Sequence, residues 1–574
     1  MSRSTRSPAP LPDETSEPGP ADGGAARTRR VVRAVVTALA GILVFLALAA
    51  PREAGQLTPL AFLRIPVESV VGLAILLVLP ERIRRVAALV AGALLGLLTL
   101  LRVLQMGFLA ILARPFDPIF DWPQLASGAS LLHGPLGATG VAVGAAAAAA
   151  VLVVLTALAT RRLAGCAARH RTATTRLVAV VTAAWLACSA LGAQLVAPVP
   201  VAARSAAASA YETAQQIATS LHDQQVFDEQ AATDPLRGIP DANLLTALRG
   251  KDVVFTYVES YGRAALENPE FGPTITPILD DGTRRLAAAG FGARSGFLTS
   301  SVTGGGSWMA HATLQSGIRV ANQHSFDKLI ASDRLTLTAA FRRAGWETVA
   351  VQPSSLGPWP ARDFYGFDRA YDSTNLGNRS RIYDGFQTPD QFTLAAFERA
   401  ERGRQDRGPL MAEIPLVSSH WPWAEIPQLL DWSAVGDGSV FDRPGAGQSD
   451  PADAVEADPD RMRDGYRRSI AYSLSALISY VETYGDDNLV LVFLGDHQAA
   501  PFVTGDGAGR DVPITLVTRD PAVLDGVAGW GWQNGLRPDP QAPVWPMEAF
   551  RDHFLTAFDA RPGTPAGDPH AAPH

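Results

Sequence analysis

Five apolar segments in the first 200 residues constrain the fold of this chain more than any other feature. They lie at residues 34–50, 60–80, 86–107, 137–160 and 177–197. Each has close to the ~20 residues with which an α-helix crosses the hydrocarbon core of a bilayer. A cleaved secretory signal is a poorer interpretation of the first segment, because further apolar segments follow it. The sequence therefore predicts a five-helix transmembrane region over residues 31–200, preceded by a polar, disordered N-terminus over residues 1–30.

Arginine residues mark the predicted cytoplasmic side. They precede the first segment and separate the second from the third and the fourth from the fifth: Arg27, Arg29, Arg30, Arg33, Arg82, Arg84, Arg85, Arg161, Arg162, Arg169, Arg171 and Arg176. The connections at 51–59 and 108–136 are poor in basic residues. By the positive-inside rule the N-terminus is cytoplasmic, and five crossings place the region after the last span outside the cytoplasm. We expect a multi-pass protein of a bacterial cell membrane, since its Ala-rich, Arg-rich and Lys-poor composition is typical of a GC-rich bacterial genome.

Charged residues and cysteines narrow the class of protein further. Arg64, Glu68 and Arg102 lie in or beside predicted spans, and we favour a structural role because their side chains can reach the membrane interface. The two cysteines, Cys166 and Cys188, both precede the exported region, which must therefore fold without disulfides. The net charge is −7 and the second half has no basic block, which argues against a nucleic-acid partner.

After residue 250, short β-rich runs alternate with amphipathic helical patterns. The predicted strands are 253–258, 347–352, 410–417, 489–494 and 513–517, and the predicted helices are 275–289, 334–344, 390–402 and 464–483. Several strands are almost continuously apolar, as strands buried on both faces are. The alternation predicts an α/β domain with a mostly parallel sheet over residues 251–560. Residues 201–250 are predicted to form a helical juxtamembrane linker, and residues 561–574 a disordered tail.

Polar residues follow two of the apolar strands. Glu259 comes directly after the first strand, and Asp496 and His497 come after the strand that ends at Leu494. Ligands of such sheets bind at the carboxyl ends of the strands. Two carboxylates and an imidazole that converge there would suit a divalent cation such as Mn²⁺ or Zn²⁺. A single acidic residue at a strand end is more often a turn former, but the adjacent Asp496–His497 pair is less easily explained in that way.

A glycine-rich segment, Thr303-Gly304-Gly305-Gly306-Ser307-Trp308, precedes a helical pattern that runs to Gly317. Glycines let the backbone approach a ligand closely, and the N-terminus of a helix favours anions such as phosphate. A metal-bound hydroxyl at Ser307 could act as a nucleophile. Taken alone, Ser307 reads more simply as a helix N-cap, and Thr303 is a weaker candidate nucleophile.

Together these motifs carry a family resemblance. VVFTYVESYG, TGGGSWMAHATLQSG, WPARDFYGFDRAYD, SSHWPW and LVFLGDHQ follow one another after the apolar region. In order and spacing they resemble lipoteichoic acid synthases and related phosphoglycerol transferases, in the sulfatase-like branch of the alkaline phosphatase superfamily. The resemblance covers nearly the whole chain and implies an extracytoplasmic alkaline-phosphatase/sulfatase-like domain.

The resemblance also implies roles for individual residues. Glu259, Asp496 and His497 match the metal ligands, and Ser307 matches the nucleophile, which also contacts the metal. His420 in SSHWPW matches a histidine that contacts the phosphate and the leaving group. Trp359 and Arg362 match a pair that binds the substrate, since a guanidinium offers paired donors to phosphate oxygens. One divalent metal ion is expected, Mn²⁺ foremost, with Mg²⁺ and Zn²⁺ as alternatives.

The chain departs from the family pattern at three positions. The nucleophile is Ser307 where relatives usually have threonine, the Trp359–Arg362 spacing is one residue longer than the family pattern, and Ser473 stands where relatives often have an acidic residue. Packing roles also remain open for several side chains. Trp359 and His420 could lie in the core, and for His311 and His324 we favour packing over a role in the site.

The resemblance implies a membrane-anchored, metal-dependent transferase. Ser307 would attack a phospholipid, phosphatidylglycerol foremost, and phosphoglycerol would pass through a Ser-linked intermediate to a cell-envelope glycan or glycolipid. The alternatives are a sulfatase or phosphodiesterase-type hydrolase, a phosphoethanolamine transferase, and an inactive envelope sensor. Trp308-Met309-Ala310-His311 does not match the x-Pro-x-Arg that follows the reactive residue of true sulfatases. Phosphoethanolamine transferases usually have disulfides, which the exported region cannot form.

Overall fold

The structure of the chain is a computed structural model. It describes residues 22–51, 62, 65–125, 137–191, 194–196, 199–200, 202–203, 205–357, 359, 361–383, 387–505 and 507–559. The chain forms two compact units, a helical unit (residues 1–103 and 139–212) and a sheet unit (residues 104–138 and 213–574). Most of the two segments predicted to be disordered, 1–30 and 561–574, lies outside the described residues. Residues 22–30, however, form the start of the first helix.

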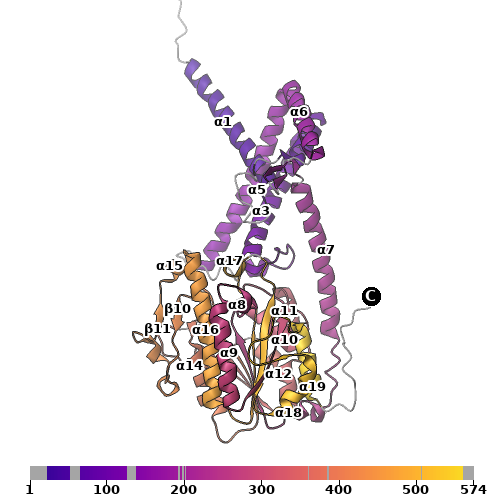
Figure 1. The fold of residues 1–574 in the computed structure, drawn as a ribbon. Coiled ribbons are helices and arrows are strands. Elements are labelled where there is room, and N and C mark those ends of the chain that lie inside the picture. Colours follow the sequence, from indigo (N-terminus) through magenta and orange to yellow (C-terminus); the bar gives the residue numbers. More distant parts are fainter. Residues whose placement is uncertain are drawn as a thin grey trace, which may run out of the picture. The chain divides into compact units, whose positions relative to one another are not determined.

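Long apolar helices form the helical unit (Figure 1). Four helices are long and apolar enough to cross a membrane: α1 (Asp22–Ala49), α3 (Glu81–Leu112), α5 (Gly137–Arg169) and α6 (Arg171–Ala190). The second predicted span corresponds to α2 (Val67–Val78), whose 12 residues are fewer than a crossing requires. Part of that predicted span lies outside the described residues. Two short strand pairs accompany the helices: β1 (Ile65–Pro66) with β4 (Ala202–Ala203), and β2 (Gln194–Val196) with β3 (Val199–Pro200).

Arg102 has a structural role in the helical unit. Its side chain is buried, and its Nη1 donates hydrogen bonds to the carbonyl oxygens of Ala47 (3.0 Å) and Ala50 (3.2 Å), while its Nε donates to Ser209 Oγ (3.3 Å). The C-terminal carbonyls of a helix have no partner within the helix, so Arg102 satisfies the end of α1. This placement supports the structural interpretation of the residue. Arg64 lies outside the described residues.

A nine-stranded sheet forms the centre of the sheet unit, with the order β14-β6-β13-β12-β5-β9-β7-β8, and β15 also pairs with β6. The strands are β5 (Asp252–Val258), β6 (Gly292–Thr299), β7 (Glu347–Gln352), β8 (Arg369–Asp372), β9 (Leu410–Leu416), β12 (Leu489–Gly495), β13 (Asp511–Thr518), β14 (Gln533–Asn534) and β15 (Val544–Pro546). The five strands from β12 to β8 are mutually parallel, whereas β13 is antiparallel to both of its neighbours. The predicted α/β fold with a mostly parallel sheet is confirmed.

Helices cover both faces of this sheet (Figure 1). The helices that follow α6 along the chain are α7 (Ser205–Ala232), α8 (Ala264–Glu267), α9 (Gly272–Ala288), α10 (Ser307–Ser316), α11 (Gln323–Ile330), α12 (Leu337–Arg343), α13 (Arg362–Tyr365), α14 (Asp390–Phe397, continued by a π-helical turn over Glu398–Arg402), α15 (Ala452–Glu456), α16 (Pro459–Tyr484), α17 (Pro501–Thr504), α18 (Pro521–Gly526) and α19 (Phe550–Phe558). The remaining short elements are β10 (Glu425–Pro427), which pairs with β11 (Gly447–Ser449), and 3₁₀ turns at Asp241–Asn243, Thr246–Leu248, Trp432–Ala434, Ser439–Asp442, Ala528–Trp530 and Met547–Ala549.

The central strand β5 shows why the apolar runs were readable as strands. Its residues are all buried, and alternate side chains enter opposite cores: Phe255 and Tyr257 pack with α10, α12 and α19, whereas Val254 and Val258 pack with α9, α14 and α16. Truncating a core aromatic residue such as Phe255 to alanine typically costs about 3–5 kcal/mol of stability. The two cores hold the sheet rigid, so the loops at its carboxyl edge have a fixed base.

Candidate active site

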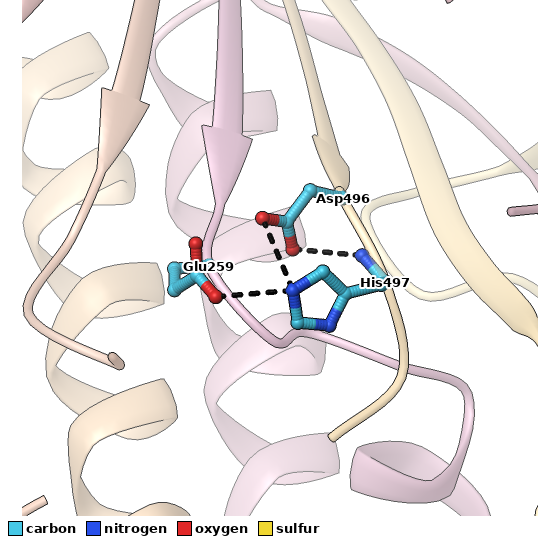
Figure 2. Close-up of side chains that lie close together, drawn as sticks. All are labelled: Glu259, Asp496 and His497. Carbon is cyan, nitrogen blue, oxygen red and sulfur yellow. Dashed lines mark hydrogen bonds and ion pairs between the residues drawn. The ribbon is translucent and has the colours of Figure 1, made fainter. Parts of the chain in front are cut away.

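The candidate metal ligands lie at the carboxyl ends of two neighbouring parallel strands. Leu494 pairs with Tyr257 and Gly495 with Val258, so Glu259 and Asp496 follow their strands at the same level. Figure 2 shows Glu259, Asp496 and His497 converging at this edge of the sheet. One ligand atom from each residue lies within 4.8 Å of the others, and all three side chains are buried. The sequence placed these three residues together, and the structure brings them together.

Hydrogen bonds orient the imidazole and one carboxylate. His497 Nδ1 is 3.0 Å from the carbonyl oxygen of Gln498, so Nδ1 carries the proton in the neutral ring and Nε2 faces the carboxylates. Nε2 is 3.2 Å from Glu259 Oε1 and 3.8 Å from Asp496 Oδ2. Asp496 Oδ1 accepts hydrogen bonds from the backbone N–H groups of Ser260 (2.8 Å) and His497 (2.7 Å). Within the described residues, Asp496 Oδ2 is buried without a hydrogen-bond partner.

These atoms form a donor set that fits a divalent cation. An unpartnered carboxylate oxygen, a second carboxylate and an imidazole lone pair meet in a buried space, an arrangement that is unfavourable without a positive charge between them. Oxygen and nitrogen donors of this kind suit Mn²⁺, Mg²⁺ and Zn²⁺. The carboxylate–histidine cluster therefore supports a metal site, and its chemistry alone does not choose among the three ions.

The electrostatics of the cluster agree with this interpretation. Burial beside the Glu259 carboxylate raises the pKa of Asp496 to about 8. Burial alone would lower the pKa of His497, but the two carboxylates outweigh it and raise that pKa to about 9. Burial also opposes ionisation of Glu259, yet the neighbouring His497 holds the pKa of Glu259 well below its ordinary value. Protons on Asp496 and His497 thus offset the charge of Glu259 when no cation is bound, and a divalent cation would take the place of those protons.

Ser307 is the first residue of α10 and its hydroxyl lies against the cluster. Its Oγ donates to Glu259 Oε2 (2.9 Å) and lies 3.2 Å from His497 Nε2. The N-cap position belongs to Gly306, which has a left-handed backbone (φ 85°, ψ 32°). The N-cap interpretation of Ser307 is therefore wrong, and its side chain is available for chemistry rather than for closing the helix.

The loop that presents Ser307 is hydrogen-bonded to the segment after β12 that carries two of the candidate ligands. The backbone N–H of Gly304 donates to the Gln498 carbonyl (2.8 Å), and Thr303 and Gln498 form an isolated parallel bridge. Ser300 Oγ donates to the Asp496 carbonyl (2.7 Å). Thr303 Oγ1 is buried and, among the described residues, has no hydrogen-bond partner. These hydrogen bonds join the glycine-rich loop to the segment that carries Asp496 and His497.

His420 reaches the same edge of the sheet from the loop after β9. Ser419 Oγ donates to the Glu259 carbonyl (2.6 Å), which ties the preceding residue to the ligand-bearing segment. The ring of His420 is half-buried, its Nδ1 is 2.6 Å from the Trp421 carbonyl, and its charge contributes to the low pKa of Glu259. Ser419 is a supporting residue that sequence reasoning missed, and only its position beside His420 could have indicated it.

Trp359 and Arg362 occupy a neighbouring segment. Trp359 is half-buried and stacks on Tyr365, with ring centroids 4.8 Å apart. Arg362 Nε donates to the Phe367 carbonyl (3.3 Å), and its Nη2 donates to the Asp368 carbonyl. Within the described residues, no hydrogen bond or ion pair joins Arg362 to Glu259, Asp496 or His497. Substrate binding by these two residues stays a prediction.

Two further histidines, His311 and His324, stack on aromatic rings, and Ser473 has a hydrogen-bond partner. His311 stacks on Tyr257 with centroids 3.7 Å apart, and burial lowers its pKa to about 3, so it packs as a neutral ring. His324 stacks on Phe120 at 5.1 Å. Ser473 Oγ donates to the Ser469 carbonyl (3.1 Å). The packing interpretation of both histidines agrees with these contacts.

Glu413 is a buried carboxyl group in β9 that the sequence did not single out. Its Oε2 accepts a hydrogen bond from Gln315 Nε2, whereas its Oε1 has no partner within the described residues. Burial raises the pKa of Glu413 from 4.5 to about 8, so it is neutral at neutral pH. Because Gln315 Oε1 accepts from Thr338 N (3.0 Å), the orientation of the Gln315 amide is fixed.

Glu413→Gln is expected to gain stability relative to the wild type as the pH rises. The unfolded state ionises near 4.5 and the folded state only near 8, so the wild type loses stability across this interval and the full loss is present above pH 8. The difference between the two pKa values corresponds to a loss of at most about 5 kcal/mol in the free energy of unfolding. Denaturant unfolding of the wild type and of Glu413→Gln at pH 5 and pH 8.5 measures the difference in their free energies of unfolding. An equal stability difference at the two pH values would contradict the prediction.

Comparison with known proteins identifies the α/β domain. Residues 251–512 match the sulfatase family model. No curated protein matches the chain. Solved structures with a similar arrangement include the lipoteichoic acid synthase LtaP from Listeria monocytogenes (16% identity, 59% of this chain and 78% of that chain, TM-score 0.37). They also include the phosphoglycerol transferase GacH from Streptococcus pyogenes in complex with sn-glycerol-1-phosphate (13% identity, 58% and 90%, TM-score 0.33).

A third similar structure is the soluble domain of lipooligosaccharide phosphoethanolamine transferase A from Neisseria meningitidis (15% identity, 56% of this chain and 93% of that chain, TM-score 0.36). The matched residues 251–512 contain Glu259, Ser307, His420, Asp496 and His497, the whole group that the sheet brings together. The resemblance to the sulfatase-like branch found in the sequence is therefore confirmed, and residues 251–512 of this chain form a sulfatase-family domain.

Proposed function

We propose that the protein is a metal-dependent transferase that moves a phosphoglycerol group from a phospholipid to a cell-envelope glycan or glycolipid. The observation that carries the proposal is the position of Ser307 Oγ, 2.9 Å from Glu259 Oε2 and 3.2 Å from His497 Nε2. A hydroxyl beside a carboxylate–histidine cluster is the arrangement that an activated nucleophile requires. Phosphatidylglycerol is the proposed donor.

Glu259, Asp496 and His497, together with Ser307 Oγ, would hold one divalent ion, with Mn²⁺ proposed and Mg²⁺ and Zn²⁺ as alternatives. Such an ion lowers the pKa of a bound hydroxyl and stabilises negative charge on phosphoryl oxygens. The Ser260 N–H and the Gln498 carbonyl orient Asp496 and His497, and hydrogen bonds of this kind would support them as ligands.

In the first half-reaction Ser307 Oγ forms a bond to phosphorus, and the bond from phosphorus to the diacylglycerol oxygen breaks. The Oγ–H of Ser307 points at Glu259 Oε2, which would receive its proton. His420 would give a proton to the departing alkoxide, releasing diacylglycerol and leaving phosphoglycerol on Ser307. In the second half-reaction the acceptor hydroxyl gives its proton to His420 and attacks phosphorus, and the bond from phosphorus to Ser307 Oγ breaks. The proton on Glu259 then returns to Ser307 Oγ, and the enzyme is restored.

The membrane helices fit a donor confined to a bilayer. We propose a location in the bacterial cell membrane, with the N-terminus in the cytoplasm and the sheet unit on the outer side, as the arginine distribution predicts. Trp359 and Arg362 are the proposed binding residues for the headgroup. The stacked indole and the guanidinium offer an apolar face and paired donors, provided that Arg362 leaves its backbone carbonyl partners when substrate binds.

Mass spectrometry of the full-length protein in detergent, after exposure to phosphatidylglycerol and Mn²⁺, tests the proposal. We expect a glycerophosphate adduct on Ser307 that is lost when a glycolipid acceptor is added. Phosphatidylethanolamine serves as the matched donor, and an adduct from it alone would reassign the headgroup to phosphoethanolamine. Free glycerol phosphate as the only product, with or without acceptor, would make the protein a hydrolase. An adduct on another residue would refute the role of Ser307.

A further inference from the structure

The polar loop after α3 belongs to the sheet unit and contacts the segment that carries Ser307. The division between the units falls after Val103, so the last turns of α3 are part of the sheet unit. Residues 113–125, here termed the 113–125 loop, follow α3 and belong to the same unit. From the sequence, this segment is expected only to connect two predicted spans. The end of α3 contacts the glycine-rich loop that precedes Ser307. The 113–125 loop contacts α10, which begins with Ser307, and α11, which follows it.

The first contact is between the end of α3 and the glycine-rich loop. Gly304 has a left-handed backbone (φ 68°), and a Cβ at this position would lie 1.8 Å from the carbonyl oxygen of Ile111. A Cβ on the next residue, Gly305, would touch the Leu112 side chain at 3.9 Å. The backbone of the nucleophile loop therefore lies directly against the C-terminal turn of α3, and glycine is required for this approach.

The second and third contacts come from the 113–125 loop itself. Gln124 Nε2 lies 4.0 Å from the sulfur of Met309, two residues after Ser307 in α10. The ring of Phe120 stacks on His324 of α11, with centroids 5.1 Å apart and an interplanar angle of 17°. The loop thus touches the nucleophile helix and the helix that follows it.

A partly buried ion pair crosslinks the 113–125 loop. Arg114 binds the Asp121 carboxylate through two parallel hydrogen bonds of 2.6 and 2.8 Å, and its Nη2 also donates to Gln124 Oε1 (2.7 Å). Asp121 is fully buried, and its Oδ2 accepts from the backbone N–H of Asp117 (2.7 Å). A bidentate pair of this kind is among the stronger side-chain interactions, and it also fixes the orientation of the guanidinium relative to the carboxylate. Arg114 therefore holds the Gln124 amide in the place where it meets Met309.

We propose that Asp121, Arg114 and Gln124 are positioning residues for the nucleophile: the 113–125 loop and the end of α3 hold the Gly304–Ser307 turn so that Ser307 Oγ stays at the metal cluster. The inference rests on the proposed role of Ser307. A displacement of about 1 Å at a reacting atom can cost about 10²-fold in rate, so contacts outside the cluster can control turnover. A segment that continues directly from a membrane-type helix thus contributes to the site of the sheet unit.

The test uses the full-length protein and three variants, Asp121→Asn, Gln124→Ala and Phe120→Ala. Turnover is measured on a soluble nitrophenyl phosphodiester and on phosphatidylglycerol in mixed micelles, together with the melting temperature and its change with Mn²⁺. We expect kcat to fall about 10- to 100-fold on both donors, with KM changed less than about twofold and the Mn²⁺-induced change in melting temperature retained. Asp333→Asn, which breaks the exposed ion pair with Arg237 (3.2 Å), is the matched control and should leave kcat unchanged.

Three outcomes would overturn the inference. Wild-type kcat in all three variants would show that the loop does not position the nucleophile. A higher KM for phosphatidylglycerol alone, with normal turnover of the soluble diester, would make the loop a lipid-binding element instead. A lower melting temperature with normal kcat in the cold would mean that it only stabilises the fold. If Asp121→Asn fails to fold, the kcat values of Gln124→Ala and Phe120→Ala decide whether the loop positions Ser307. Ser307→Ala separates a failure of the positioning inference from a failure of the proposed function. Retained diester turnover in that variant would refute the proposed function itself.

Discussion

Replacing Ser307 with alanine is expected to lower phosphodiester turnover by at least about 10³-fold, because the substitution removes the only hydroxyl of the described residues that touches both Glu259 and His497. The fold should be unaffected, since Ser307 does not cap α10. Ser307→Thr should retain activity, because a secondary hydroxyl can occupy the same position. Steady-state rates on phosphatidylglycerol with each purified full-length variant measure the effect.

Thr303→Val provides the matched control for that experiment. Thr303 lies in the same glycine-rich segment, but its buried Oγ1 has no hydrogen-bond partner within the described residues, and valine has the same shape. We expect less than a tenfold change in rate for Thr303→Val. If Thr303→Val abolished turnover while Ser307→Ala retained it, the nucleophile would have to be reassigned to Thr303.

Removal of the metal is expected to stop turnover and to lower the thermal stability of the sheet unit. A ligand present at about a hundredfold excess over its Kd stabilises the folded state by about 2.7 kcal/mol. Chelation should therefore lower the melting temperature by a few degrees, and Mn²⁺ should restore both the melting temperature and the rate. Thermal unfolding with and without Mn²⁺ measures the stability effect independently of any assay of activity.

Single variants of the ligands extend this prediction. Asp496→Asn and Glu259→Gln should each abolish the Mn²⁺-induced rise in melting temperature, because each removes a charged donor from the cluster. Glu413→Gln is the control: it neutralises another buried carboxyl group of the same sheet, and it should keep the full response to Mn²⁺. An unchanged response in both ligand variants would place the metal at some other site.

The strands that the sequence predicted are those whose two faces are both buried. β5, β7, β9 and β12 read as continuous apolar runs because each side chain enters one of two cores. β6 was missed because its sequence, GARSGFLT, is small and polar. Gly296 has no side chain because the indole of Trp532 lies over it, where a Cβ would come within 2.6 Å of Nε1. A contact with a residue so far along the chain leaves no local signal.

The site was predictable as far as it depends on strand ends. Glu259 and Asp496 could be brought together because parallel neighbouring strands end at one edge, and the apolar runs indicated both strands. The direction of the Ser307 side chain could not be predicted, because an N-cap and a first helical residue look alike in sequence, and Gly306 decides between them. The fixed position of the Arg362 guanidinium on backbone carbonyls likewise depends on local loop geometry.

The pairing of β5 with β12 has a consequence for the biogenesis of this protein. Ser260 N–H and Asp496 Oδ1 are 236 positions apart in the chain, and the segment between them supplies β6, β7, β8 and β9. Contacts between such distant residues slow folding, because the long loop between them must be closed before they can form. A chain in which β12 has not yet joined the sheet therefore has no assembled cluster of Glu259, Asp496 and His497. The proposed activity would begin only when the fold is complete, after the last strand of the cluster has been made.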